Sequence, residues 1–288
     1  MKVLVSGATG FVASHLIPAL AAAGHDVVAA GHDRARIPEG ATVLHLDLAG
    51  HDWPPLPEAD AVIHLAQANV PFPEGADALF AVNVAATQRL LEHARRTGAR
   101  RFVLASSGSV YGASAGSLTE ESPLAARDFY SATKVAAERL IQAYDEHLGI
   151  AILRLFVPYG PGQVRRMLPR LVERIRSGEP IQLNREGRPR MNPIYVDDVV
   201  HVMLRALEDA ESFEVLNVAG DDVTDVRDVS DLIGELLGIE PKFEASDADV
   251  ADIVADNTAL HAFLGGARLV PLREGIGRMV EPEWRSSI

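Results

Sequence analysis

The N-terminal stretch holds the feature that most constrains the fold: a short apolar run that meets two glycines and continues as a helical pattern. The run from Val3 to Val5 is too brief for much besides a buried strand, and Gly7, Gly10 and Ala13 follow it with the spacing G-x-x-G-x-x-A. Gly7 can take the tight turn that leaves the strand because it has no Cβ. Gly10 removes a side chain where an anion would approach the backbone, and the N-terminus of the next helix offers it free N–H groups. The pattern predicts a strand, turn and helix that bind the pyrophosphate of a dinucleotide.

Apolar runs of strand length alternate with helical patterns through the first half of the chain. We expect further strands at residues 26–30, 43–48, 61–66, 101–105 and 150–156, and helices at residues 11–23, 80–97 and 129–147. Alternation of this kind builds right-handed βαβ units and a parallel sheet covered on both faces. The sequence therefore predicts an α/β fold with a Rossmann-type, doubly wound parallel sheet, whose ligands bind beyond the carboxyl ends of the strands.

After residue 160 the alternation loosens. The remaining patterns predict helices at residues 166–177, 197–207 and 227–237, a short strand near Ile181 and another strand at residues 215–218. We expect residues 1–160 to form an NAD(P)-binding domain to which later strands return, and residues 161–288 to form mainly a smaller, interleaved substrate-binding lobe. The acidic run at residues 244–256 is typical of a solvated surface.

Composition excludes several classes of function. The net charge of −13 argues against a general surface for nucleic acid or for an anionic membrane. Cysteine is absent, and the histidines show no H-E-x-x-H or other paired ligand spacing, so we expect no metal site. The N-terminus shows no leader pattern and no window has the length of a membrane span, from which we expect a cytoplasmic protein.

Tyr130 and Lys134 form the pattern that points to chemistry. Residues four apart on a helix share a face, so the phenol and the ammonium can lie side by side. A phenol is a poor base at neutral pH, because its ordinary pKa is about 10. A nearby ammonium favours the phenolate and lowers that pKa. With Ser107 orienting a carbonyl or an alcohol, these residues predict an acid/base group that faces a hydride-carrying cofactor.

The end of the second predicted strand leaves the choice of cofactor open between NAD and NADP. The place where an NAD-binding fold usually has an acidic residue is taken by Gly31. Asp33 could still reach a ribose, whereas Arg34 or Arg36 could hold a 2′-phosphate. We lean towards NAD.

The chain resembles the extended short-chain dehydrogenase/reductase family, in particular its NAD-dependent nucleotide-sugar epimerases and dehydratases of the UDP-glucose 4-epimerase kind. Motifs of that family stand in order along nearly the whole chain: Gly7 to Phe11, His64 to Ala66, Asn83 to Thr87, Ser107 to Gly112, Tyr130 to Lys134, Tyr159 to Gly162, Tyr195 to Val199, Leu216 to Gly220 and Pro271 to Ile276. The resemblance implies that Tyr130 is the acid/base, Lys134 the ribose anchor and Ser107 the hydroxyl that orients the substrate.

The motifs and the resemblance together give a set of expected cofactor-binding residues. They are Gly7, Thr9, Gly10, Phe11, Val12, His32, Arg34, Asp47, Leu48, Leu65, Ala66, Gln67, Asn83, Ala105, Tyr130, Lys134, Phe156 and Pro158. Asp47 is expected near the adenine and Asn83 near the active site. The resemblance further implies a homodimer in which helices at residues 80–97 and 129–147 pair.

Departures from the family pattern concern the substrate. Family members that act on nucleotide sugars usually have an asparagine where this chain has Val157, which weakens the epimerase interpretation. The expected substrate-contacting residues are Ser109, Val157, Arg165, Arg166 and Arg190. The guanidinium groups among them match the oxygens of a diphosphate.

The sequence thus predicts an NAD(P)-dependent epimerase or dehydratase that acts on a sugar, expected to be a nucleotide sugar, through a transient keto intermediate. One alternative is an NADP-dependent carbonyl reductase of a non-nucleotide substrate, which Gly31 and Val157 favour. An alternative of another class is a non-catalytic NAD(P)-binding regulator, since a fold does not determine function. A P-loop is excluded because no Gly-Lys-Ser/Thr follows Gly10, and a G-x-S-x-G nucleophile is excluded because Ala105 precedes Ser106.

Overall fold

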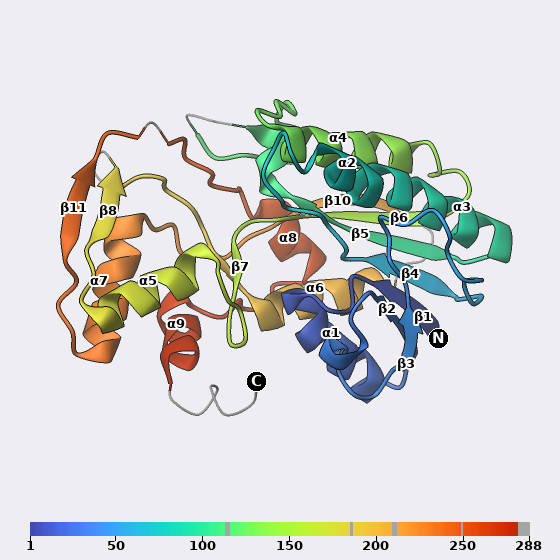
Figure 1. Cartoon of the computed structure of the whole chain (residues 1–288), viewed down its shortest axis with the longest axis horizontal. Coiled ribbons are helices and arrows are strands. Elements are labelled where there is room, and N and C mark those ends of the chain that lie inside the picture. Colours follow the sequence, from blue (N-terminus) through green and yellow to red (C-terminus); the bar gives the residue numbers. More distant parts are fainter. Residues whose placement is uncertain (113–115, 185–186, 209–211, 249, 282–288) are drawn as a thin grey trace. The chain divides into compact units, whose positions relative to one another are not determined.

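We describe the protein from a computed structural model, which defines residues 1–112, 116–184, 187–208, 212–248 and 250–281. The chain forms two compact units (Figure 1). Unit 1 consists of residues 1–110, 123–154 and 200–216, and unit 2 of residues 111–122, 155–199 and 217–288. The chain therefore passes from one unit to the other several times. The expected domain boundary at residue 160 stays a prediction.

Unit 1 is built on a seven-stranded sheet whose strand order is β10-β6-β5-β4-β1-β2-β3. Its strands are β1 (Lys2–Ser6), β2 (Asp26–Gly31), β3 (Thr42–His45), β4 (Ala61–His64), β5 (Arg101–Ser107), β6 (Gly149–Leu155) and β10 (Phe213–Val218). The pairs β1–β2, β2–β3, β1–β4 and β4–β5 are parallel. The order runs outwards in both directions from β1 and β4, so the predicted doubly wound Rossmann-type sheet is confirmed. In such a sheet the point of reversal is where ligands bind.

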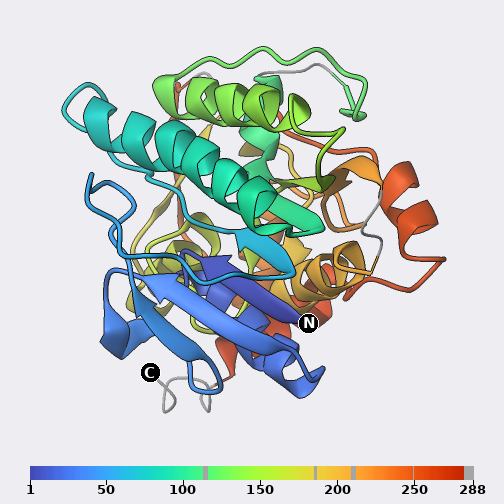
Figure 2. The same cartoon turned by 90° about the vertical axis from the view of Figure 1, so that its right-hand side faces the viewer.

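Helices cover both faces of this sheet. They are α1 (Phe11–Ala22) on one face, and α2 (Ala76–Phe80), α3 (Ala86–Thr97) and α4 (Phe129–Gln142) on the other (Figure 1). Figure 2 shows α3 and α4 running side by side along the sheet. Helix α1 buries Ala13, Leu16, Ile17 and Leu20, which recur at helical spacing on one face. The core between the sheet and α3 and α4 includes Leu4, Val62, Leu90, Phe102, Ile141 and Ile152.

The structure corrects several predicted boundaries in unit 1. The helix expected to start at residue 80 starts at Ala76 and passes through a π-helical turn at Ala81–Ala85 before α3. The helix expected to reach residue 147 ends at Gln142. The third strand ends at His45 instead of residue 48, because the Asp47 carboxylate accepts a hydrogen bond from the amide of Ala49 and turns the chain. Side-chain bonds of this kind compete with strand pairing, and apolar patterns do not reveal them.

Unit 2 has its own apolar core, which includes Tyr159, Leu168, Val172, Ile233 and Ile276. Two small parallel pairs of strands contribute to it, β7 (Pro158–Tyr159) with β9 (Ile194–Tyr195) and β8 (Ile181–Asn184) with β11 (Phe243–Ser246). The helices are α5 (Met167–Ser177), α7 (Val226–Leu237), α8 (Thr258–Phe263) and α9 (Leu272–Val280), and α6 (Val196–Ala206) passes from unit 2 into unit 1. The patterns predicted α5, α6, α7 and β8 but missed β7, β9, β11, α8 and α9. Strand β11 overlaps the start of the run expected to be plain acidic surface.

The described part of the chain contains no helix with both the length and the apolar character needed to span a membrane.

Candidate functional site

The turn between β1 and α1 lies where the strand order reverses. Gly7 has a φ of +78°, a left-handed conformation that glycine adopts freely. A Cβ on Gly7 would stand 2.5 Å from the amide nitrogen of Ala66, so only glycine lets these two strand ends approach. Gly10 caps α1 without any side-chain hydrogen bond, and the first turn of α1 holds no acidic residue. The N-cap residue of α1 therefore offers no side-chain acceptor to the first N–H groups of the helix, which suits the pyrophosphate of a dinucleotide.

A buried histidine connects this turn to the helices on the other face. The Nδ1 of His64 lies 2.6 Å from the Ser6 hydroxyl, and its Nε2 lies 3.0 Å from the hydroxyl of Thr87. Burial and, to a smaller extent, the charge of Lys134 lower the pKa of His64 to about 3, so the ring is neutral. The Thr87 hydroxyl in turn donates to the carbonyl of Asn83. His64 thus carries a hydrogen-bond connection from the β1 end to α3.

Asn83 joins three segments of unit 1. Its Oδ1 accepts from the amide of Ala68 at 2.8 Å, while its Nδ2 donates to the Ala68 carbonyl and to the hydroxyl of Thr133. Thr133 stands next to Lys134 on α4. Asn83 is almost wholly buried and its amide is fully used, so the contacts place it as a clamp between the loop after β4 and α4.

Lys134 lies buried in unit 1 with its ammonium directed at the end of β5. Its Nζ donates to the carbonyl oxygen of Ala105 at 2.6 Å, and the side chain is only 1% exposed. Burial lowers the pKa of this ammonium to about 8, and the negative charge of Glu138 partly opposes that shift. Helix α4 presents Lys134 this way because Asp128 and Ser131 form a capping box that determines where the helix begins.

Tyr130 bonds to a side chain, whereas Ser107 bonds to a backbone amide. The Tyr130 hydroxyl donates to the Oε1 of Gln67 at 2.6 Å. The Ser107 oxygen accepts from the amide of Ser109 at 3.2 Å. The hydroxyl of Ser109 is itself buried and has no hydrogen-bond partner among the described residues. A buried polar group without a partner is costly, so this hydroxyl is a place that a bound polar molecule would satisfy.

The remaining predicted cofactor residues of unit 1 gather after β2, β3 and β4. Asp33 uses its carboxylate to cap the short turn Arg34–Arg36, accepting from the amide of Ala35, and His32 and Arg34 are exposed. Asp47 and Leu48 follow β3, and Leu65 and Ala66 follow β4. Thr9, Phe11 and Val12 belong to the turn before α1 and to its first residues. These residues share the carboxyl ends of the strands, where the sequence predicted a site.

The other predicted residues belong to unit 2 and are described within it. Phe156 stacks in a tilted arrangement on Tyr111, with ring centroids 6.2 Å apart, and Pro158 pairs with Ile194. Val157 and Arg165 have φ values of +46° and +58°, the left-handed region that few such residues adopt. Arg166 occupies the N-cap position of α5 without a side-chain cap hydrogen bond, and the amide of Arg190 donates to Asp252. Their expected contacts with cofactor or substrate stay predictions.

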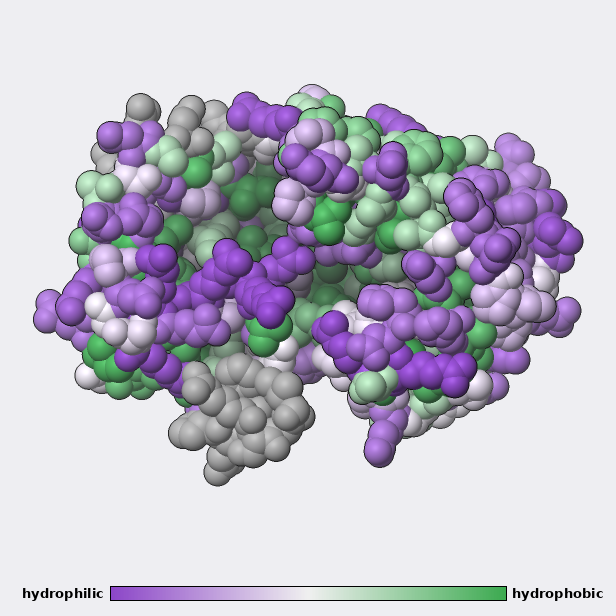
Figure 3. Space-filling view, viewed as in Figure 1, coloured by the Kyte–Doolittle hydropathy of each residue, from purple (hydrophilic) through white to green (hydrophobic). Residues whose placement is uncertain are grey.

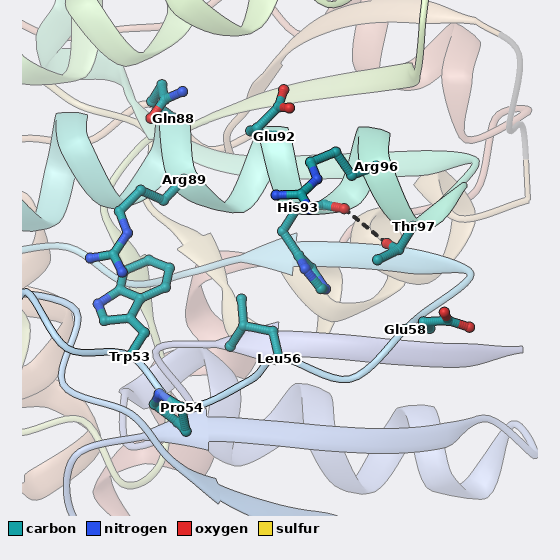
Figure 4. Close-up of a pocket in the computed structure, with 10 residues that line it drawn as sticks. All are labelled: Trp53, Pro54, Leu56, Glu58, Gln88, Arg89, Glu92, His93, Arg96 and Thr97. Atoms are coloured by element: carbon teal, nitrogen blue, oxygen red, sulfur yellow. Dashed lines mark hydrogen bonds between the residues drawn. The ribbon is translucent and has the colours of Figure 1, made fainter.

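A groove of about 590 Å³ lies elsewhere on unit 1, between residues 53–58 and α3 (Figure 4). It contains none of the predicted site residues. Arg89 lies 3.6 Å above the ring of Trp53 and donates to the carbonyls of Gly50 and His51, while His93 contacts the carbonyl of Pro57. Because Arg89 and His93 already bond to backbone carbonyls of the loop, we interpret the groove as the place where this loop packs against α3.

Sequence reasoning missed several residues of this site. It quoted His64 only as part of a motif, and it did not consider Thr87, Glu138 or Arg154 individually. The only signal for Glu138 was its position one helical turn after Lys134. No local pattern connects Arg154 to it.

The fold and the site together define a dinucleotide-binding protein that has a tyrosine and a lysine, one helical turn apart, at the carboxyl edge of a doubly wound sheet. Residues 3–219 match the NAD dependent epimerase/dehydratase family, and the chain belongs to that family. This confirms the resemblance drawn from the motifs, and the family's description carries the expected NAD.

Relatives and solved structures agree with this membership. The chain is 31% identical over 307 residues to a UDP-glucose 4-epimerase of Mycolicibacterium smegmatis, an alignment that covers 98% of each protein. It is 30% identical to an uncharacterized UDP-glucose epimerase of Bacillus subtilis, over 86% of this chain and 85% of that protein. Among solved structures, MoeE5 in complex with UDP-glucuronic acid and NAD superimposes over 100% of both chains with a TM-score of 0.87 and 31% identity.

Proposed function

We propose that this protein is an NAD-dependent epimerase or dehydratase that acts on a nucleotide sugar through a transient keto intermediate. The observation that carries the proposal is the Tyr130–Lys134 pair on α4, in the same unit as an α1 whose N-cap residue, Gly10, makes no side-chain hydrogen bond. The similarity to UDP-glucose 4-epimerases over nearly the full chain supports it. Epimerisation is the first choice and dehydration the second.

The residues present suit NAD. The Gly7–Gly10 turn and the first amides of α1 would hold the pyrophosphate, and Asp47 would lie near the adenine. Lys134 would bond the hydroxyls of the nicotinamide ribose. When bound, NAD supplies a hydride acceptor that can also return the hydride. Asp33 is already used to cap a turn, and Arg34 and Arg36 beside it are exposed, so retention of NAD against NADP by the purified protein tests this preference.

The chain's own residues would accept and return the proton of the substrate hydroxyl. In the resting state the Tyr130 phenol is a donor to Gln67. To act as a base, Tyr130 would first release its phenolic proton to solvent. The phenolate oxygen would then accept the proton of a substrate hydroxyl that takes the place of Gln67. The ammonium of Lys134 favours the negative charge that this requires, because an opposite charge nearby stabilises a phenolate. Ser107 would orient the substrate oxygen.

Substrate recognition by Ser109, Val157, Arg165, Arg166 and Arg190 is the finer part of the proposal. In unit 1 it is supported by the buried hydroxyl of Ser109, which has no hydrogen-bond partner in the part of the chain that the structure describes. In unit 2, Arg165 and Arg166 stand together where α5 begins. Guanidinium groups match phosphate oxygens, so a diphosphate is the group we expect them to hold.

The test is to purify the protein without added cofactor, measure NAD released on denaturation, and assay UDP-, GDP- and dTDP-hexoses without adding NAD. We expect bound NAD and conversion of a nucleotide hexose with no net change in NADH. Net oxidation of NADPH by a non-nucleotide ketone would instead identify a carbonyl reductase. Bound cofactor without turnover of any sugar would identify a regulator.

We further propose a homodimer in which the helices expected at residues 80–97 and 129–147 pair, through the face that also carries α2. Val70, Phe72 and Phe80 are exposed by 42%, 59% and 55%, and Phe72 stacks on Phe129 at the start of α4 with centroids 5.0 Å apart. Figure 3 shows hydrophobic residues gathered over α2 and α4, with hydrophilic ones towards the far end of α3. Exposed apolar patches of this kind mark association surfaces. Light scattering should give twice the chain mass, and Phe72→Glu with Phe80→Glu should give the monomer. The cytoplasmic location expected from the sequence stays a prediction.

A further inference from the structure

Glu138 is a buried carboxylate that the proposed chemistry does not yet use. It lies on α4 one turn after Lys134, and its exposed fraction is 0%. Burying a charge costs several kcal/mol unless it is paired and hydrogen-bonded. A carboxylate in this position therefore needs an explanation.

Two partners inside unit 1 stabilise this carboxylate: Arg154 neutralises its charge, and Ser106 donates a hydrogen bond to it. The Nη2 of Arg154 lies 2.8 Å from its Oε2, and the Nε of Arg154 lies 3.2 Å from both oxygens. The hydroxyl of Ser106 donates to Oε1 at 2.5 Å. Arg154, on β6, is itself only 4% exposed. A well-packed apolar pair is often as stable as a buried ion pair, so stability alone does not account for this arrangement.

The partners of Glu138 lead directly to the proposed active site. Ser106 is the link between Ala105, whose carbonyl receives the Lys134 ammonium at 2.6 Å, and Ser107, the expected substrate-orienting hydroxyl. One carboxylate therefore holds the end of β5 against α4 at the point where β5 supplies both groups. A displacement of the backbone at Ser106 would strain the hydrogen bond to Glu138.

The same carboxylate acts on the charge of Lys134. Burial lowers the pKa of Lys134, the negative charge of Glu138 opposes that shift, and the resulting pKa is about 8. The other titratable groups facing this region are His64 on β4, which is neutral because burial lowers its pKa to about 3, and Arg154 on β6, which pairs with Glu138. Glu138 thus counteracts the loss of the ammonium's proton.

We propose that Glu138, held by Arg154 and bonded to Ser106, is a positioning residue: it fixes the Ala105–Ser107 segment against α4 and places a negative charge one helical turn from Lys134. Its effect on turnover rests on the proposed function, whereas its effect on Lys134 does not.

Lys134 can be observed without any activity, because the chain has only three lysines, Lys2, Lys134 and Lys242. Lysine labelled with ¹³C at Cε gives one signal for each, and Lys134→Met assigns the buried one. We expect Glu138→Gln to lower the titration midpoint of Lys134 by about one pH unit, which corresponds to a roughly tenfold loss of charged lysine above the midpoint. Glu146→Gln, which removes an exposed carboxylate just beyond the same helix, should leave the midpoint unchanged. An unchanged midpoint in folded Glu138→Gln would overturn the proposal.

Two further variants keep the test decisive. Glu138→Gln leaves Arg154 buried without its charged partner. The double variant Glu138→Gln with Arg154→Met removes both charges, and its Lys134 titration replaces that of the single variant if the latter does not fold. Ser106→Ala should leave the Lys134 midpoint in place and lower kcat more than it raises KM. If Ser106→Ala leaves kcat unchanged, the positioning of residues 105–107 is refuted. If the unaltered protein converts no nucleotide sugar, the proposed function fails, while the titration still reports on Glu138.

Discussion

Val157 offers a sharp test of the backbone of unit 2. Its φ of +46° is in the left-handed region, which costs an L-residue about 1–2 kcal/mol because Cβ crowds the following carbonyl. Val157 is also β-branched and precedes Pro158, whose ring favours an extended conformation for the residue before it. The conformation is held in place by the surroundings, since the Val157 carbonyl accepts from the amide of Ile194 and the side chain packs on the core of unit 2.

Comparing Val157→Ala with Val157→Gly isolates this strain. Both variants lose the same γ-methyl groups, but only glycine also loses Cβ and its crowding. Glycine normally costs about 0.5–1 kcal/mol relative to alanine through its greater freedom in the unfolded chain. Relief of 1–2 kcal/mol should exceed that, so we expect the Gly variant to be more stable than the Ala variant by about 0.5–1 kcal/mol.

Urea denaturation at neutral pH measures the difference, with Ala132→Gly as the matched control. Ala132 is exposed on α4, where glycine should cost about 1 kcal/mol in the usual direction. The same Ala-to-Gly step should therefore have opposite signs at positions 157 and 132. A Val157→Gly protein that is less stable than Val157→Ala would refute the strain, and a changed m-value would show that the comparison is not of two similar transitions.

Three more predictions concern unit 1. Gly7→Ala should destabilise the protein by about 3 kcal/mol or more and abolish NAD retention. The reason is that a Cβ would stand 2.5 Å from the Ala66 nitrogen, at a φ of +78°. A melting temperature close to that of the unaltered protein would contradict this. Tyr130→Phe should lower kcat at least about 10²-fold while the released NAD stays the same, and undiminished turnover would remove Tyr130 from its proposed role. Since the pKa of His64 is about 3 in the folded protein and 6.5 ordinarily, only the unfolded chain takes up its proton as pH falls below 6.5. The free energy of unfolding should therefore drop by about 2 kcal/mol between pH 7 and pH 5, and His64→Asn should reduce that drop in urea titrations at both pH values.

Local patterns predicted the parts of this protein that depend on neighbouring residues. The G-x-x-G turn, the helix at α1 and the alternation of strands and helices all follow from backbone freedom and apolar spacing over short windows. Element ends were less accurate where a side chain turned the chain, as Asp47 does after β3. The short pairs β7–β9 and β8–β11 were partly or wholly missed, because two- and four-residue strands have too little sequence to show a period.

The residues of the site likewise divide into those that local patterns predicted and those that they did not. Helical spacing alone was enough to place Tyr130 and Lys134 on one face of a helix, and the glycine spacing predicted where a dinucleotide would be held. The sequence by itself therefore determined the class of fold and the kind of chemistry.

Only the tertiary structure decided which buried groups support that chemistry. Glu138 meets Arg154 and Ser106, and His64 meets Ser6 and Thr87, across separations of 16 to 58 residues. Such partners are selected when strands and helices pack and leave no water to satisfy a buried charge or ring nitrogen. That selection has no counterpart in a local pattern, because the cost of burying the group arises only once the core has closed.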